Sequence, residues 1–210
     1  MNLEHYYWYF KEAIPARICD DIVKYGKSIK DQMALTGGFE KNKTLNKEQV
    51  KDLKSKRDSN IAWITDLWVY KEIRPYIHSA NVNAGWNFEW DFSESCQFTK
   101  YEKGQYYDWH CDSWDKPYFR QHPNDPSHGK IRKLSVTVTL SDPKDYKGGE
   151  LEFDFRNMDP DKKPNIMKCK EILPKGSLVV FPGFVWHRVC PVKSGERNSL
   201  VIWNLGYPFQ

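Results

Sequence analysis

His110 and Asp112 flank a cysteine in the triplet H-C-D, which carries the residue types in this chain best suited to metal chemistry. Residues two apart in an extended strand point to the same side, so His110 and Asp112 can share one target. A second histidine, His187, lies far downstream in the sequence F-P-G-F-V-W-H-R-V. Two imidazoles and one carboxylate form a facial set suited to non-haem Fe(II), with coordination positions left open. The expected metal ligands are His110, Asp112 and His187, with Cys111 pointing away.

Two further residues make this pattern more specific than H-x-D alone. Tyr101 begins the run Y-x-x-G-x-x-Y-x-x-H-x-D, and Arg197 follows His187 by ten residues. The two segments would form neighbouring strands of a barrel, where an arginine can make a bidentate pair with a carboxylate. The spacing therefore predicts a site that binds a metal ion together with an organic acid.

The composition indicates one globular domain. The chain has 210 residues, of which 40% are hydrophobic and 15% aromatic. Its 32 basic residues nearly balance 28 acidic ones, so the net charge of +4 does not indicate a nucleic-acid partner. The five cysteines include no C-x-x-C pair, and neither a leader sequence nor a membrane span is evident. We expect a cytoplasmic protein with reduced thiols and no membrane partner.

The hydrophobic pattern predicts helices first and strands afterwards. Helical spacing runs through residues 15–33 and again from about 65 to 77, with a polar loop and a short helix over 39–60 between them. After Gly85 the period changes to two, which indicates several short strands of a sandwich or barrel. This order predicts an α+β fold. The polar loops 36–60 and 113–131 are expected to select the substrate, because the second directly follows the metal ligands.

The motifs resemble those of one known family over about residues 57–207. The chain is similar to the prolyl 4-hydroxylase-like branch of the Fe(II)/2-oxoglutarate-dependent dioxygenases. The resemblance implies a double-stranded β-helix (jelly-roll) core with the N-terminal helices packed on one sheet. It implies a single domain over 1–210, with 1–85 as mainly helical support and 86–210 as the core. The matching stretches are R-D-S-N-I-A-W-I, A-N-V-N-A-G-W-N-F, Q-F-T-K-Y-E-K-G-Q-Y-Y-D-W-H-C-D, L-S-V-T-V-T-L-S-D, G-G-E-L-E-F and W-H-R-V-C-P-V-K-S-G-E-R-N-S-L-V-I-W.

The resemblance also implies the cofactors and their ligands. Fe(II) would be held by His110, Asp112 and His187, with 2-oxoglutarate and O2 as cosubstrates and ascorbate as a candidate reductant. Arg197 would pair with the C5 carboxylate of 2-oxoglutarate, where collagen-type relatives have a lysine.

Three other residues take roles by the same resemblance. Tyr101 matches a tyrosine that hydrogen-bonds the cosubstrate. Thr139 stands where oxygen-sensing relatives have a tyrosine near the same carboxylate, although its hydroxyl reaches less far. Trp203 is expected to pack beneath the cosubstrate or beside it, or simply in the core.

The resemblance implies an oxygenase of the procollagen-proline or peptidyl-prolyl 4-hydroxylase type, acting on a proline-containing peptide or protein. Hydroxylation of a free amino acid or small metabolite is an alternative, and so are a metal isomerase of the cupin kind and a non-catalytic jelly-roll binding module. Nucleobase repair is disfavoured, because the related repair enzymes usually carry an arginine where this chain has Trp203. The sequence leaves the oligomeric state open.

Overall fold

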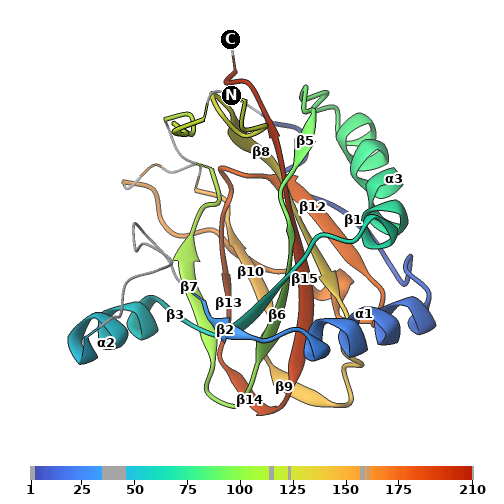
Figure 1. Cartoon of the computed structure of the whole chain (residues 1–210), viewed down its shortest axis with the longest axis vertical. Helices are drawn as coiled ribbons and strands as arrows, with labels where there is room; N and C mark the ends of the chain where they lie inside the picture. The colour runs from blue at the N-terminus through green and yellow to red at the C-terminus, as the bar shows by residue number, and fades with distance from the viewer. Residues whose placement is uncertain are drawn as a thin grey trace.

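Two antiparallel sheets face each other in the computed structural model, as Figure 1 shows. The structure describes residues 3–34, 46–113, 116–122, 124–156, 159 and 161–209. Every strand pairing within them is antiparallel. The predicted α+β jelly-roll is confirmed.

The larger sheet has the strand order β1-β12-β8-β15-β6-β4-β2, with β5 paired to β15. Ser135, Thr137 and Thr139 alternate along β8 with Leu134, Val136 and Val138, so the polar side chains face away from the apolar core on the other side. Its strands are β1 (Trp8–Phe10), β2 (Gln32–Met33), β4 (Asn60–Ile64), β5 (Phe92–Ser93), β6 (Cys96–Tyr101), β8 (Ile131–Thr139), β12 (Leu178–Pro182) and β15 (Arg197–Gly206).

The smaller sheet has the strand order β11-β10-β13-β7-β3. A separate two-stranded sheet joins β9 (Tyr146–Gly148) to β14 (Val192–Gly195). Aromatic side chains join the two large sheets, because Phe153 of the smaller sheet packs edge-on against Phe181 of the larger one. The strands of the smaller sheet are β3 (Arg57–Asp58), β7 (Tyr106–His110), β10 (Leu151–Asp154), β11 (Ile166–Lys168) and β13 (Trp186–Val189).

Among the helices of the described residues, α1 and α3 cover the larger sheet (Figure 1). In α1 (Ala16–Ser28) the buried positions include Gly26, where a Cβ atom would lie 2.5 Å from the ring of Phe98. In α3 (Leu67–Asn83) Val69, Ile73 and Ile77 form one buried stripe at spacing i, i+4. The expectation that the helices pack on one sheet holds for α1 and α3. The short 3₁₀ helix η1 (Lys170–Ile172) precedes β12.

The short helix predicted within 39–60 is α2 (Lys47–Lys56), which lies beside β3 rather than on the larger sheet. It begins with a capping box, in which the side chains of Asn46 and Gln49 each accept a hydrogen bond from the other's backbone N–H. Residues 36–45 of the expected substrate loop lie outside the described residues. The first 85 residues also supply β1 to β4, so both large sheets include strands from this mainly helical region.

The alternation of Trp86, Phe88 and Trp90 predicted a strand, and this prediction was wrong for residues 86–91. Trp86 and Phe88 are buried as the pattern requires, but Asn87 has a φ of 51°. The side chain of Asn81 donates to the carbonyl of Phe88 and accepts from its N–H. A side-chain amide therefore satisfies the backbone groups that a neighbouring strand would have paired. No helix in the described part of the chain is long and apolar enough to cross a membrane.

Candidate functional site

The sheets bring the three expected metal ligands together. His110 ends β7 and lies directly opposite His187 of β13 in the smaller sheet. Asp112 follows β7, where its backbone N–H donates to the carbonyl of Gly183 at 2.8 Å. One nitrogen or oxygen atom from each of His110, Asp112 and His187 lies within 4.8 Å of the others. Within the described residues this is the single group of three such side chains close enough to hold one metal ion.

Backbone carbonyls orient both imidazoles. Nδ1 of His110 lies 2.7 Å from the carbonyl oxygen of Asp108, and Nδ1 of His187 lies 2.9 Å from that of Val185. A carbonyl can only accept, so each Nδ1 carries a proton, and Nε2 is the nitrogen of each ring that can bind a metal ion. The two Nε2 atoms lie 3.9 Å and 3.5 Å from the carboxylate oxygens of Asp112. These distances exceed a normal hydrogen bond, so the imidazoles do not bond to the carboxylate directly and all three groups can bind a shared ion.

The electrostatics keep the ligands in the states that a metal ion requires. Burial, and secondarily His187, lower the pKa of His110 to about 3, so its imidazole is neutral. Burial opposes ionisation of Asp112, but the two histidines, Arg132 and a 2.7 Å hydrogen bond from Ser135 outweigh it and lower the pKa of this carboxyl. Two imidazoles and one carboxylate fit Fe(II).

An irregularity in β7 brings a fourth side chain to the metal ligands. His187 pairs with His110 and Val189 pairs with Tyr107, so three steps along β7 match two along β13. This bulge places Tyr107 and His110 on the same face, although simple alternation would separate them. Their rings stack at 3.5 Å with an interplanar angle of 14°. Trp109 lies beneath the guanidinium of Arg188 instead, 4.7 Å from the ring centroid.

A cavity lies between the sheets beside the three ligands. Alternate residues of β15 form one wall, because a regular strand points every second side chain to the same face. The residues that line the cavity are Arg57, Gln97, Tyr101, Tyr107, His110, Asp112, Thr137, Leu151, His187, Val189, Arg197, Ser199, Val201 and Trp203.

Arg197 has the environment of an anion-binding group. It is 2% exposed, its Nη1 donates to Ser199 Oγ at 3.2 Å, and its guanidinium carbon lies 5.6 Å from the ring centroid of Tyr101 on the paired strand. Within the described residues no carboxylate pairs with it. A buried guanidinium needs a compensating anion, so this side chain fits the distal carboxylate of an organic acid. Gly149 leaves room for Arg197, because a Cβ at that position would lie 2.8 Å from its Cδ.

The structure separates two threonines of β8. Thr137 lines the cavity, while Thr139 is buried outside the set of residues that line it. Thr139 follows Thr137 by two residues on the same face of β8 and pairs with Ser199 of β15. Thr137, which the sequence did not single out, is a second hydroxyl on the cavity wall, and the role of Thr139 toward the acid stays a prediction.

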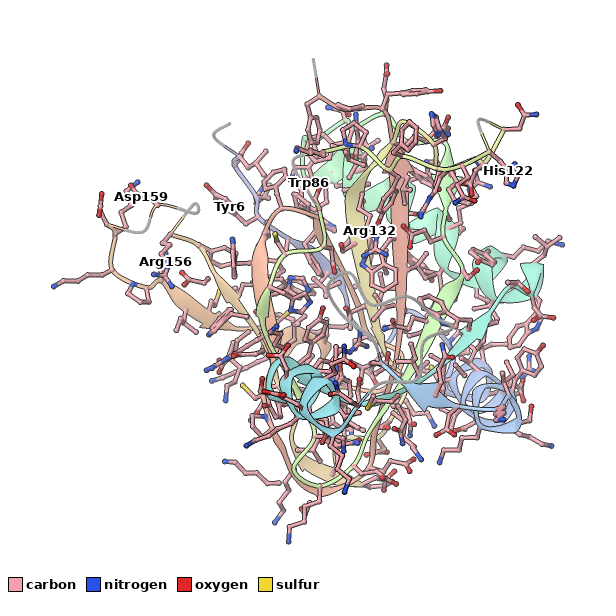
Figure 2. The ribbon with its side chains drawn as sticks, turned by 60° about the vertical axis from the view of Figure 1, so that its left-hand side comes forward. Tyr6, Trp86, His122, Arg132, Arg156 and Asp159 are labelled. Carbon is pink, nitrogen blue, oxygen red and sulfur yellow. The ribbon has the colours of Figure 1, made fainter. Side chains whose placement is uncertain are left out.

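Trp203 lies in the cavity wall beneath a half-buried ion pair. The guanidinium of Arg132 lies 3.8 Å from the Trp203 ring centroid and binds both carboxylate oxygens of Glu94, at 3.0 and 2.6 Å. A register shift at the start of β8 turns Arg132 to this face, which alternation from Leu134 would not predict. Figure 2 shows Arg132 in the middle of the molecule and His122 on a peripheral loop. Trp203 Nε1 has no hydrogen-bond partner within the described residues.

The described part of the loop 113–131 folds back toward this ion pair. Tyr118 and Lys130 are joined by a backbone hydrogen bond of 2.9 Å, and Arg120 covers the Tyr118 ring at 4.4 Å. Burial raises the pKa of Tyr118, whose hydroxyl lies close to Arg132 and Glu94. This part of the loop therefore lies beside the ion pair over Trp203, and its selection of the substrate stays a prediction. Residues 114, 115 and 123 lie outside the described residues.

Sequence reasoning missed several cavity residues. Arg57 is 4% exposed in the cavity wall, and no carboxylate among the described residues pairs with it. Gln97 was not singled out. Ser and Thr alternate with apolar residues along β8, and this alternation could have indicated that Ser135 and Thr137 face the site. Nothing in the sequence indicated that Ser135 would donate to Asp112.

Comparison with known proteins agrees with this geometry. Residues 96–204 match the 2OG-Fe(II) oxygenase superfamily, so the chain belongs to that family. Its expected cofactors are therefore Fe(II), 2-oxoglutarate and O2. A PKHD-type hydroxylase of Synechococcus is 35% identical over 114 residues, which are 54% of this chain and 42% of the relative. The chain thus matches less than half the length of that curated relative.

Solved structures share the fold. A viral collagen prolyl hydroxylase from Paramecium bursaria Chlorella virus-1 superposes with a TM-score of 0.62 at 21% identity, covering 97% of both chains. A prolyl hydroxylase from Trichoplax adhaerens, solved with a hypoxia inducible factor peptide fragment, gives 0.63 at 16% identity. That match covers 96% of this chain and 84% of the other. At these identities the likeness establishes the jelly-roll architecture.

Proposed function

We propose that residues 1–210 form one oxygenase domain that uses Fe(II), 2-oxoglutarate and O2 to hydroxylate a C–H bond. The observation that carries this proposal is the convergence of His110, Asp112 and His187 within 4.8 Å, beside a buried arginine that lacks a described carboxylate partner. The three side chains would hold iron. Iron bound there would supply the redox chemistry that couples decarboxylation of 2-oxoglutarate to hydroxylation.

The protein's part in this reaction is to bind, orient and exclude water. Arg197 would hold the C5 carboxylate through its guanidinium, while Ser199 keeps that guanidinium in place. The hydroxyls of Tyr101 and Thr137 lie on the same cavity wall and would add hydrogen bonds to the acid. Leu151, Val189 and Val201 make the rest of that region apolar, which strengthens the charge-assisted contacts. Trp203 would close the cavity beside the acid.

We further propose that the substrate is a peptide or protein, with a prolyl residue as the hydroxylated position. Support comes from the structural neighbours described as prolyl hydroxylases, one of them solved with a peptide fragment. The loop 113–131 at the site could contact an extended chain. A free amino acid is the alternative substrate that the same site would accept.

The test is a reaction of the purified chain with Fe(II), 2-oxoglutarate and ascorbate under air. We expect succinate to form, and mass spectrometry of a proline-rich peptide library to show the gain of one oxygen atom. His187→Ala should lose both signals. His78→Ala, at an exposed histidine of α3 outside the cavity and outside the loop 113–131, should retain them and serves as the control. Full succinate production by His187→Ala would contradict the proposal.

A further inference from the structure

The iron ligand His110 is covered by a stack of two further side chains. The Tyr107 ring lies 3.5 Å from the His110 ring and nearly parallel to it. On Tyr107 lies the guanidinium of Arg57, with its central carbon 4.4 Å from the ring centroid. The stack of Arg57, Tyr107 and His110 therefore links β3 to the metal ligand at the end of β7.

Several features of the backbone build this stack. Arg57 and Tyr107 are direct partners in the pairing of β3 with β7. The bulge in β7 then turns Tyr107 to the same face as His110. Ser59 accepts a 2.9 Å hydrogen bond from Arg57 Nε, which orients the plane of the guanidinium. Because no described carboxylate pairs with Arg57, its position is set by the stack and by Ser59.

The two histidines differ in how their rings are supported. His187 lies in the core, where Phe181 packs against it edge-on at 4.7 Å. The side chain of His110 is more exposed, at 15% against 7% for His187. A hydrogen bond from Nδ1 to Asp108 fixes one point of the His110 ring but leaves the tilt of its plane free. The Tyr107 face opposes this tilt, as Phe181 does for His187.

We propose that Tyr107 and Arg57 are positioning residues for His110, with Tyr107 holding the imidazole plane and Arg57 holding Tyr107. This inference rests on the proposed metal site. By this inference, the affinity for the metal depends partly on the bulge in β7 and on β3, a strand that carries none of the three ligands. Groups that orient a ligand affect metal affinity by about 10-fold to 100-fold, so the stack should be measurable without any turnover.

The test is titration of the metal-free protein with Co(II), followed by visible absorption. Tyr107→Leu should weaken Co(II) binding by about 10-fold or more and broaden or shift the absorption band. Tyr107→Phe, which keeps the ring, should bind as the unchanged protein does. Tyr106→Leu is the matched control, because the hydroxyl of Tyr106 bonds to carbonyls of α2 and it is not part of the stack. Its Co(II) affinity should not change.

The variant Arg57→Lys tests the role of Arg57, the outer member of the stack. Lysine keeps the positive charge but lacks the planar face, so a purely electrostatic role would leave Co(II) affinity unchanged. A positioning role predicts a loss of about threefold or more, which corresponds to the lower end of the range for a cation–π contact. The double variant Arg57→Lys with Tyr107→Leu should bind no more weakly than Tyr107→Leu alone.

The outcomes separate this inference from the proposed function. If the unchanged protein binds no Co(II) at His110, the metal site itself is wrong. If it binds Co(II) and both Tyr107→Leu and Arg57→Lys bind equally well, only the stack is wrong. Additive losses in the double variant would show that Arg57 acts independently of Tyr107, which also contradicts the proposal. Should Tyr107→Leu fail to fold, Arg57→Lys alone decides, against the same control.

Discussion

Strands β15 and β7 both line the cavity, but they place their side chains in different ways. In β15, Arg197, Ser199, Val201 and Trp203 reach the cavity at every second residue of a regular strand. In β7, a bulge puts Tyr107 and His110 on one face three residues apart. Regular alternation spaces side chains by about 6.6 Å along a strand, whereas a bulge can bring two of them into contact.

This difference divides the site into two parts with different sensitivities. The anion-binding part depends on a ladder in which β15 is held between β6 and β8. The metal-binding part depends on local contacts around the bulge and on carbonyl groups that orient the imidazoles. Changes on β15 should therefore affect 2-oxoglutarate while sparing the metal, and changes around β7 should affect the metal first.

Removal of a ligand should have the largest effect. Asp112→Ala leaves two imidazoles without the anion that balances the metal charge, so we expect Co(II) affinity to fall by more than about 100-fold, beyond the range of supporting residues. Calorimetric titration of the metal-free protein would measure this loss. Asp108→Ala keeps the carbonyl that orients His110 and serves as the control, because only the exposed side chain is removed. Unchanged affinity in Asp112→Ala would contradict the metal assignment.

The next largest effect is expected from a change on β15. Arg197→Gln removes the buried guanidinium, and loss of one partner of a buried charge pair costs about 2–5 kcal/mol. The KM for 2-oxoglutarate should rise by about 30-fold or more, since each 1.4 kcal/mol is tenfold. Co(II) affinity should stay within a factor of about two if the two parts are separate. A parallel loss of metal affinity would show that they are not.

A pair of glycines offers a finer test of the anion-binding part. Gly149 and Gly85 both have positive φ, at 67° and 69°. A Cβ at Gly149 would press on Arg197 Cδ, while one at Gly85 would meet nothing within 4 Å. Each alanine variant should lose about 1–2 kcal/mol of unfolding free energy from the left-handed backbone. Only Gly149→Ala should also raise the KM for 2-oxoglutarate, and equal KM values in the two variants would contradict the contact.

The smallest expected effect distinguishes two threonines on one strand. Thr137 lines the cavity and Thr139 does not, so Thr137→Val removes a hydroxyl that can reach the acid. Loss of one hydrogen bond of about 1 kcal/mol predicts a rise of roughly fivefold in the KM for 2-oxoglutarate. Thr139→Val should leave this KM unchanged. The reverse result would restore the role that the sequence resemblance gave to Thr139.

The contrast between the regular strand β15 and the bulged strand β7 also explains which features could be predicted from the sequence. His110, Asp112, His187 and Arg197 could be found because their types and spacing are specific and because alternation is reliable along regular strands. Trp203 lines the cavity, and its contact with the cosubstrate stays a prediction. The jelly-roll followed from the period-two segments and the motifs.

The remaining features depend on contacts between distant segments. A bulge turns Tyr107 toward the cavity side of its sheet, and a register shift does the same for Arg132. Neither irregularity can be recognised from a single sequence. The burial of Arg57 depends on pairing between β3 and β7, which are separated in the chain by helix α3 and three strands of the other sheet. The apparent strand at 86–91 failed because Asn81 satisfies its backbone from a helix.

The central claim is that one cavity holds the metal on β7 and β13 and the acid on β15. A crystal structure with Mn(II) and 2-oxoglutarate, grown without oxygen, tests it most directly. We predict an anomalous peak between the Nε2 atoms of His110 and His187 and the carboxylate of Asp112, with the C5 carboxylate against Arg197. A metal peak away from these three side chains, or an acid bound elsewhere than Arg197, would contradict the account.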